Sequence, residues 1–226
     1  MTIKGFSLFL FFLLLFGCQQ KENQSENNKT VQKEQSKQPE VNSEKKVIVF
    51  FGNSIIAGYQ LDLSEAFPAI IGGIVDSLGL DYRVVNAGLS GETTASGNSR
   101  VDWVLKNKVD VFVLELGAND GLRGIQTTET RKNLQSIIDK VKNKYPSAKI
   151  VLAGMQIPPN LGQEYANDFK TIYPELAEKN NTTLIPFILE GVAGIPELNL
   201  DDGIHPTPEG HKILAENIWG ILKPLL

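Results

Sequence analysis

Apolar and polar residues alternate in blocks along most of this chain. After Lys46, short runs rich in β-branched and aromatic residues alternate with longer segments in which apolar residues recur every three or four positions. Near-continuous apolar runs are typical of strands buried on both faces, whereas the longer spacing is typical of helices with one buried face. The five runs that we predict to be strands are Val47–Phe51, Tyr82–Asn86, Val111–Leu116, Lys149–Met155 and Thr183–Phe187.

Three of the intervening segments have the periodicity of amphipathic helices. One covers residues 66–79 with Pro68 in its first turn, another covers 128–145 with Thr127 or Thr128 as its N-cap, and the last begins at Pro208. Their expected buried stripes are, in chain order, Ile70, Ile71, Ile74 and Leu78; Leu134, Ile137, Ile138 and Val141; and Ile213, Leu214, Ile218 and Leu222.

This alternation predicts the architecture and the place of any active site. Strands that alternate with helices through short connections form a parallel sheet covered by helices on both faces, with right-handed crossovers. We therefore expect a three-layer α/β/α sandwich around a five-stranded parallel sheet. Sites in such folds lie beyond the carboxyl ends of the strands. Candidate catalytic residues should therefore directly follow strands.

The first 18 residues have a different pattern, which is typical of an export signal. Lys4 precedes an apolar run from Phe6 to Phe16, followed by Gly17 and Cys18. The run is shorter than the roughly 20 residues of a membrane span and has the layout of a secretory signal. Residues 15–18 also resemble the bacterial lipoprotein signal, in which the cysteine becomes the lipidated first residue. The alternative is an ordinary secretory signal that contains a cysteine.

Residues 19–46 separate this signal from the alternating region. They consist mainly of Gln, Asn, Ser, Lys and Glu, with six Lys against five Glu. Such a segment cannot bury enough apolar surface to offset its ordering entropy, so we expect a flexible polar tether. The remaining residues, 47–226, are enough for one domain with a sizeable core.

Composition narrows the classes of partner and cofactor. Residues 47–226 carry 15 basic and 21 acidic residues, and an acidic domain argues against nucleic acid as the partner. Cys18 is the only cysteine of the chain, so an exported form has no internal disulfide and gives no indication of a thiolate metal site.

Candidate catalytic chemistry begins near the C-terminus. Asp202 stands three residues before His205, one of only two histidines. A carboxylate at that spacing can hold one ring nitrogen, fix the tautomer and leave the other nitrogen to act as a base. Asp120 could compete with Asp202 as the partner of His205, but the fixed spacing favours Asp202. His211 falls in the last expected helix and is interpreted as a helix-face residue.

Polar residues follow three of the expected strands. Ser54 comes after the first strand, where a nucleophile is expected, although a serine there more often caps a helix. Gly91 lies in a glycine-rich loop after the second strand and could bring its N–H close to a substrate oxygen. Asn119, after the third strand, could donate to a developing oxyanion, although Asn-Asp-Gly is also good turn chemistry. Glu115, inside an apolar strand, must find partners or stay protonated, and we expect it to bond neighbouring loops.

These segments together resemble the SGNH, or GDSL, hydrolase family. Gly-Asn-Ser at 52–54, Gly91, Gly-x-Asn-Asp at 117–120 and Asp-x-x-His at 202–205 match the four blocks of that family in order. The resemblance covers essentially all of 47–226 and is greatest to the bacterial thioesterase I/lysophospholipase L1 (arylesterase) branch. It implies a flavodoxin-like SGNH fold.

The resemblance also implies a role for each position. Ser54 would be the nucleophile, His205 the base and Asp202 its orienting acid. The backbone N–H groups of Ser54 and Gly91 and the side chain of Asn119 would form the oxyanion hole. Asn53 stands where the family usually has Asp, which removes a charge beside the nucleophile, and we expect activity to survive.

The resemblance implies a serine esterase that needs neither a cofactor nor a metal. The expected substrates are lysophospholipids, acyl thioesters, and aryl or short-chain esters. Two alternatives remain open: a carbohydrate O-acetylesterase on the same scaffold, and a flavodoxin-like module that binds a ligand without catalysis. We expect a monomeric, exported bacterial lipoprotein, anchored through Cys18 to a membrane of the periplasm or outer cell envelope.

Overall fold

A five-stranded parallel sheet forms the centre of the domain. The computed structural model describes residues 44–226, so the expected signal (1–18) and residues 19–43 of the expected tether lie outside the described residues. The strands lie in the order β2-β1-β3-β4-β5, and all neighbouring pairs are parallel. Their bounds are Lys46–Gly52 (β1), Tyr82–Gly88 (β2), Val111–Glu115 (β3), Lys149–Ala153 (β4) and Thr183–Ile185 (β5).

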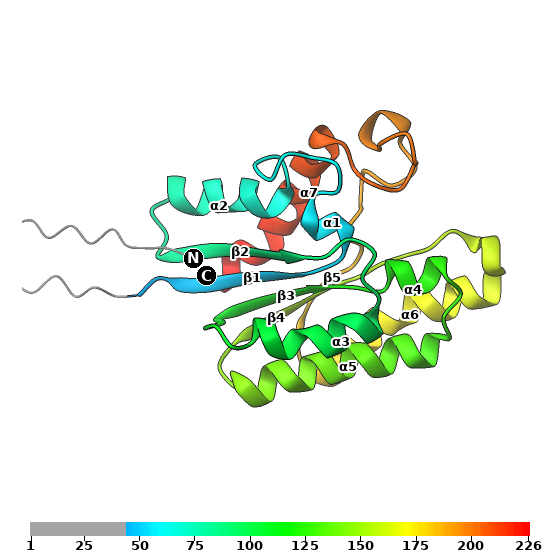
Figure 1. Ribbon diagram of the computed structural model, residues 1–226, viewed down its shortest axis with the longest axis horizontal. Helices are drawn as coiled ribbons and strands as arrows, with labels where there is room; N and C mark the ends of the chain where they lie inside the picture. Colours follow the sequence, from blue (N-terminus) through cyan, green and yellow to red (C-terminus); the bar gives the residue numbers. More distant parts are fainter. Residues whose placement is uncertain (1–43) are drawn as a thin grey trace, which may run out of the picture. The chain divides into compact units, whose positions relative to one another are not determined.

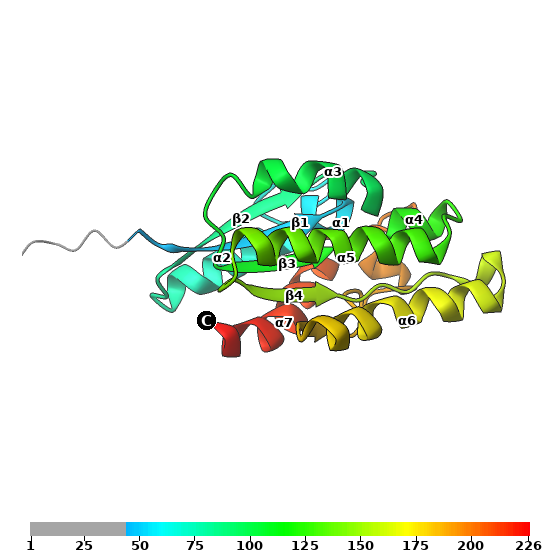
Figure 2. The same cartoon turned by 90° about the horizontal axis from the view of Figure 1, so that it is seen from below.

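Helices cover both faces of this sheet, which confirms the expected three-layer architecture. Helices α2 and α7 pack on one face, and α3, α5 and α6 pack on the other (Figure 1; Figure 2). The helix bounds are Ser54–Ala57 (α1), Phe67–Ser77 (α2), Thr94–Val104 (α3), Ala118–Leu122 (α4), Thr127–Lys144 (α5), Gln163–Asn180 (α6) and Pro208–Leu222 (α7). Short 3-10 turns lie at Pro159–Leu161 (η1), Pro196–Leu198 (η2) and Lys223–Leu225 (η3).

Burial of apolar residues explains the central strands. The side chains of β1 after Lys46 and of all β3 residues are buried, because these strands have neighbours on both sides and helices on both faces. The outer strand β2 differs from the expectation of burial on both faces, since only Tyr82 of its residues is fully buried. Within residues 44–226, no helix combines the length and hydropathy that a membrane span requires.

Two predictions about the helices are wrong. The expected threonine N-cap of α5 is wrong, because Gln126 is the N-cap and the Thr127 hydroxyl donates to Asp168 of α6 instead. The expected stripe of α2 is wrong at Leu78, which follows the last helical residue and is 52% exposed, while Val75 is buried in its place.

Candidate active site

Ser54 is the first residue of the short helix α1, which follows the inner strand β1. Asn53 is the N-cap of α1, and its Oδ1 accepts a hydrogen bond from the Ile55 N–H at 2.9 Å. This cap satisfies one of the N–H groups that have no partner within a helix, and it fixes the first turn. The Ser54 side chain is therefore held at the carboxyl end of the sheet, with 7% of the residue exposed.

Asp202 and His205 lie in the loop that leads into α7. Asp202 Oδ1 accepts the backbone N–H groups of Ile204 and His205, each at 3.0 Å, so the carboxylate organises the turn that carries the imidazole. The loop is also held by the Leu200 N–H, which donates to the His205 carbonyl at 2.7 Å. Both ends of the loop are thereby fixed by backbone contacts.

The three side chains form a continuous chain of hydrogen bonds. Asp202 Oδ2 lies 2.6 Å from His205 Nδ1, and His205 Nε2 lies 2.8 Å from Ser54 Oγ. Burial acts to raise the pKa of Asp202, but hydrogen bonds from Ile204 and His205 outweigh it and lower that pKa. A charged Asp202 favours a proton on Nδ1, so that Nε2 can accept the proton of the serine hydroxyl.

The other expected oxyanion donors, Gly91 and Asn119, are each held by a hydrogen bond to a neighbouring segment. Gly91 adopts a positive φ of 79°, and its carbonyl accepts from Arg123 at 3.1 Å, which turns its loop. Among the described residues, the backbone N–H groups of Ser54 and Gly91 have no hydrogen-bond acceptor in the protein. Asn119 uses one amide proton to bond the Glu92 carbonyl at 3.1 Å, which fixes its orientation and leaves a second proton available.

Asp120, the alternative partner of His205, and His211, the second histidine, are both held by other contacts. Asp120 is fully buried and accepts from the Thr94 N–H at 2.8 Å, so it joins α4 to α3 and does not contact His205. His211 lies in α7, where its Nδ1 accepts the N–H of Phe67 at 3.1 Å. Burial lowers the pKa of His211 to about 4, with a smaller contribution from the charge of His205.

Two features near the site were not expected from the sequence. The Tyr59 ring lies over the His205 imidazole, with centroids 4.4 Å apart and planes inclined by 35°. The residue after Gly91, Glu92, forms a partly buried ion pair with Arg100 of α3. Tyr59 is five residues beyond Ser54 in the sequence, but no sequence pattern indicates that its ring covers a residue as distant as His205.

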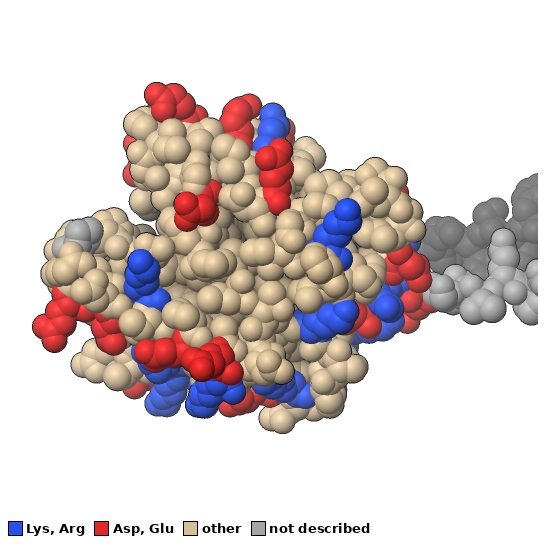
Figure 3. Space-filling model, turned by 180° about the vertical axis from the view of Figure 1, so that it is seen from behind, with Lys and Arg blue, Asp and Glu red and all other residues tan. Residues whose placement is uncertain are grey.

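Charged side chains form no metal-binding cluster among the described residues, and they are mixed in sign on the face shown in Figure 3. Residues 44–226 contain no cluster of three His, Cys, Asp or Glu side chains that could hold a metal ion. On the face in Figure 3, acidic and basic side chains are interspersed around the periphery, and the centre carries neither. That face shows no continuous basic stripe of the kind typical of nucleic-acid-binding domains.

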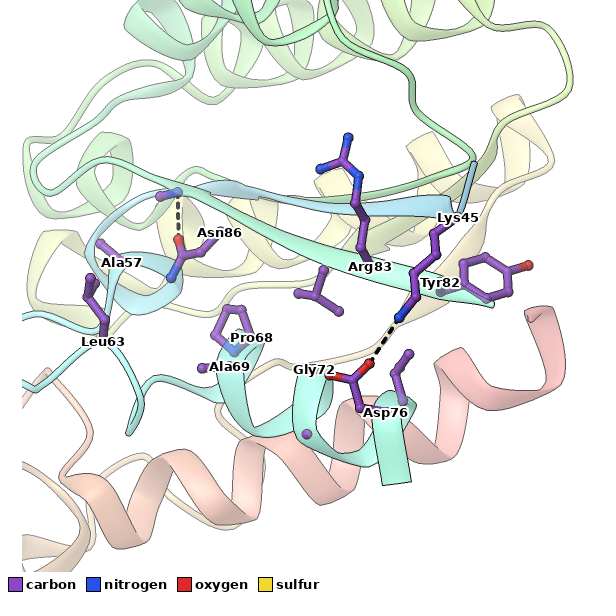
Figure 4. A pocket seen from close by; sticks show the side chains of 14 residues that line it. Lys45, Ala57, Leu63, Pro68, Ala69, Gly72, Asp76, Tyr82, Arg83 and Asn86 are labelled. Carbon is purple, nitrogen blue, oxygen red and sulfur yellow. Dashed lines mark hydrogen bonds and ion pairs between the residues drawn. The ribbon is translucent and has the colours of Figure 1, made fainter. Parts of the chain in front are cut away.

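A hollow of about 690 Å³ lies away from these residues, between α2 and β2. Gly72 of α2 faces it, and the ion pair between Lys45 and Asp76 closes one side (Figure 4). None of Ser54, Asp202 or His205 lines this hollow. It is therefore separate from the candidate active site.

Comparison with known proteins gives consistent matches over the domain. Residues 50–213 match the model of the GDSL-like Lipase/Acylhydrolase family. Esterase TesA of Pseudomonas aeruginosa is 41% identical over 180 residues, which are 79% of this chain and 89% of that protein. Thioesterase 1/protease 1/lysophospholipase L1 of Escherichia coli K12 is 37% identical over 180 residues, 79% of this chain and 84% of that protein. The crystal structure of TesA superposes with a TM-score of 0.76 and 41% identity, covering 80% of this chain and 100% of that chain.

Proposed function

This chain belongs to the GDSL-like lipase/acylhydrolase family and is an ester hydrolase, and we propose that Ser54, His205 and Asp202 carry out its reaction. The observation that supports these roles is the hydrogen-bond chain from Asp202 through His205 to Ser54 Oγ, with distances of 2.6 and 2.8 Å. Both distances lie in the range that proton transfer between a base and a nucleophile requires.

The proposed reaction has two halves. His205 Nε2 accepts the hydroxyl proton while Ser54 Oγ attacks the carbonyl carbon of the ester or thioester. The N–H groups of Ser54 and Gly91 and the amide of Asn119 donate to the resulting oxyanion. Collapse expels the alcohol or thiol, which takes the proton from His205. Water, deprotonated by His205, then attacks the acyl-serine, and the carboxylic acid leaves as Ser54 regains its proton.

Exposed apolar side chains in segments that follow the strands support a substrate with an acyl or aryl group. Leu89 follows β2, Leu122 belongs to the helix that carries Asn119, and Ile204 precedes His205; they are 50%, 45% and 44% exposed. Such side chains gain by covering apolar surface of a bound substrate. We therefore favour lysophospholipids, acyl thioesters, and aryl or short-chain esters over acetylated carbohydrate.

Hydrolysis of a defined panel by purified residues 44–226 tests this proposal. The panel contains p-nitrophenyl esters of increasing chain length, an acyl thioester, a lysophospholipid and an acetylated glycan. A serine-reactive fluorophosphonate should label the wild-type chain at Ser54 and fail to label Ser54→Ala, which should lose hydrolysis. Labelling that persists in Ser54→Ala would refute the assignment of the nucleophile. Preference for the acetylated glycan would identify an O-acetylesterase instead.

We also propose that the enzyme is an exported bacterial lipoprotein, held to a membrane of the cell envelope through lipidated Cys18. The support is the sequence of residues 1–18 and the polar segment that follows. Expressed in a bacterium, the full chain should fractionate with membranes and be released by detergent, whereas Cys18→Ser should not be retained. We expect a monomer, for which sedimentation of residues 44–226 is the test.

A further inference from the structure

Glu115 is a buried carboxyl group that the proposed reaction does not use. It is the last residue of β3, none of it is exposed, and it pairs in register with Gly52 of β1. Its Oε1 accepts from Asn53 Nδ2 at 2.8 Å, and its Oε2 accepts from the Asn53 backbone N–H at 3.2 Å. Both oxygens therefore contact the residue directly before the proposed nucleophile.

The backbone of Gly52 lies unusually close to Glu115. A Cβ atom added to Gly52 would lie 2.2 Å from the Glu115 carbonyl oxygen and 2.6 Å from its Oε2. Only glycine leaves room for the carboxyl group at that point. The end of β1 and the end of β3 are consequently joined by the Glu115 side chain as well as by the strand ladder.

The bonds to Glu115 determine which way the Asn53 amide faces. Because Nδ2 donates to Glu115, Oδ1 is directed toward α1, where it accepts from the Ile55 N–H and lies 3.4 Å from Ser54 Oγ. A reversed amide would place Nδ2 against the Ile55 N–H and leave two donors facing each other. The position of the Ser54 hydroxyl therefore depends on the conformation of Asn53, which two acceptor atoms of Glu115 hold in place.

From this arrangement we propose that Glu115 is a positioning residue, which acts through Asn53 to hold the Ser54 hydroxyl in line with His205. The proposal rests on the assignment of Ser54 as nucleophile. It assigns no proton transfer to Glu115, since both of its carboxyl oxygens are engaged by Asn53.

The hydrogen bonds from Asn53 favour the charged form of the Glu115 carboxyl group, whereas its other surroundings disfavour that form. Burial raises the pKa of Glu115 to about 8, the hydrogen bonds from Asn53 oppose that rise, and the charge of Glu92 adds to it. Glu92 is itself paired with Arg100 of α3. From α6, the Tyr173 hydroxyl donates to the Leu116 carbonyl at 3.0 Å rather than to the carboxyl group.

Exchanging the donor and the acceptor tests the proposal. Glu115→Gln supplies one acceptor where Asn53 needs two, so kcat per active site should fall at least about tenfold, as expected for one buried unsatisfied donor, with KM little changed. In Asn53→Asp/Glu115→Gln, the new amide at position 115 donates to the new carboxylate at position 53, and its oxygen accepts the backbone N–H. The double variant should therefore recover most of the loss.

Matched measurements separate positioning from general destabilisation. Active sites are counted by fluorophosphonate labelling, and each variant is also unfolded thermally. Asp110→Asn is the control, because the Asp110 carboxylate likewise accepts a backbone N–H of β1, that of Val47 at 2.8 Å, but at the opposite end of the strand. Asp110→Asn should lower Tm without lowering kcat per labelled site.

The outcomes distinguish this proposal from the proposed function. If wild type hydrolyses esters and Ser54→Ala does not, the nucleophile stands, whatever the Glu115 variants do. Wild-type kcat in Glu115→Gln would overturn the positioning role. So would a double variant that folds but is no more active than Glu115→Gln. Should Glu115→Gln fail to fold, the double variant must fold and hydrolyse esters for the proposal to hold.

Discussion

Tyr59 contacts the imidazole of His205 through its aromatic ring, in addition to the hydrogen bonds that the imidazole makes. Its ring lies 4.4 Å from that of His205, so one face of the imidazole is covered by an aromatic surface. When His205 takes the serine proton it becomes a cation, and an aromatic face attracts a cation. The contact also limits rotation of the ring away from Ser54.

Replacing Tyr59 should therefore affect turnover more than substrate binding. Tyr59→Ala removes about 0.5–1 kcal/mol of cation–π attraction, so kcat should fall about two- to fivefold. Tyr59→Phe keeps the ring and should retain most of the activity. Steady-state kinetics of both variants on one p-nitrophenyl ester provide the measurement. An equal loss in Tyr59→Phe would show that the hydroxyl, not the ring face, is responsible.

Asn119 is the proposed oxyanion donor that can be removed without altering the backbone. Asn119→Ala should lower kcat by about 10²–10³-fold, because one lost oxyanion donor typically costs about 2.7–4 kcal/mol of barrier. Asn217→Ala is the matched control, since the Asn217 amide also donates to a backbone carbonyl, that of Glu190 at 2.9 Å. If Asn119→Ala loses no more kcat than Asn217→Ala, Asn119 is not an oxyanion donor.

At the scale of elements, His211 joins two helices on one face of the sheet. Helix α2 has no side-chain N-cap, and the Phe67 N–H at its first turn donates to His211 Nδ1 of α7. Only a ring nitrogen without a proton can accept this bond. Protonation of His211 should therefore break the contact between α2 and α7.

The lowered pKa of His211 sets the direction of the pH effect. The folded state binds the proton only near pH 4, whereas the unfolded chain binds it near 6.5, so the stabilisation is present above 6.5 and is lost as the pH falls toward 4. We expect a loss of about 3 kcal/mol across that window, because a difference of one pKa unit between the folded and unfolded states corresponds to about 1.4 kcal/mol.

The substitution His211→Asn offers an acceptor that does not titrate. The free energy of unfolding of this variant, measured in urea between pH 4 and 7.5, should fall less steeply with acid than that of wild type. Identical slopes would mean that His211 does not titrate on unfolding in this range. Asp202, whose pKa is lowered from 3.8, affects both proteins alike at still lower pH.

The elements also show what the sequence could predict. All five strands lie where apolar runs predicted them, because burial on both faces leaves a clear pattern in β1 and β3. Helices α3 and α6 were not identified. Helix α3 begins Thr-Ala-Ser-Gly-Asn-Ser, with no apolar stripe, and α6 contains Pro174, which ordinarily breaks a helix. Their existence depends on packing against α5 rather than on local preference.

The candidate site was predictable where its contacts are local. Asp202 and His205 are three residues apart, so their contact followed from spacing. The contact between Asn53 and Glu115 depends on the register of β1 against β3, and the stacking of Tyr59 on His205 depends on how α1 exits through Gly58. Neither register nor helix exit is encoded in a short motif, so these two contacts required the structure.

At the scale of the whole molecule, every helix and strand of the described chain lies between Lys46 and Leu225. Removing residues 1–43 should therefore leave the thermal unfolding temperature and kcat close to those of the full chain carrying Cys18→Ser. Differential scanning calorimetry and ester hydrolysis of both proteins provide the test. A clearly lower Tm in the shorter protein would show that the N-terminal residues contribute to the stability of the domain.

The contact between Ser54 and His205 spans 151 positions of the chain. A ribosome makes the hydroxyl long before the imidazole, and the two meet only after β5 and the loop before α7 have been synthesised. Nascent chains that end before His205 should consequently be hydrolytically silent. The order of the elements thus delays the appearance of an ester-cleaving activity until the loop before α7 has left the ribosome.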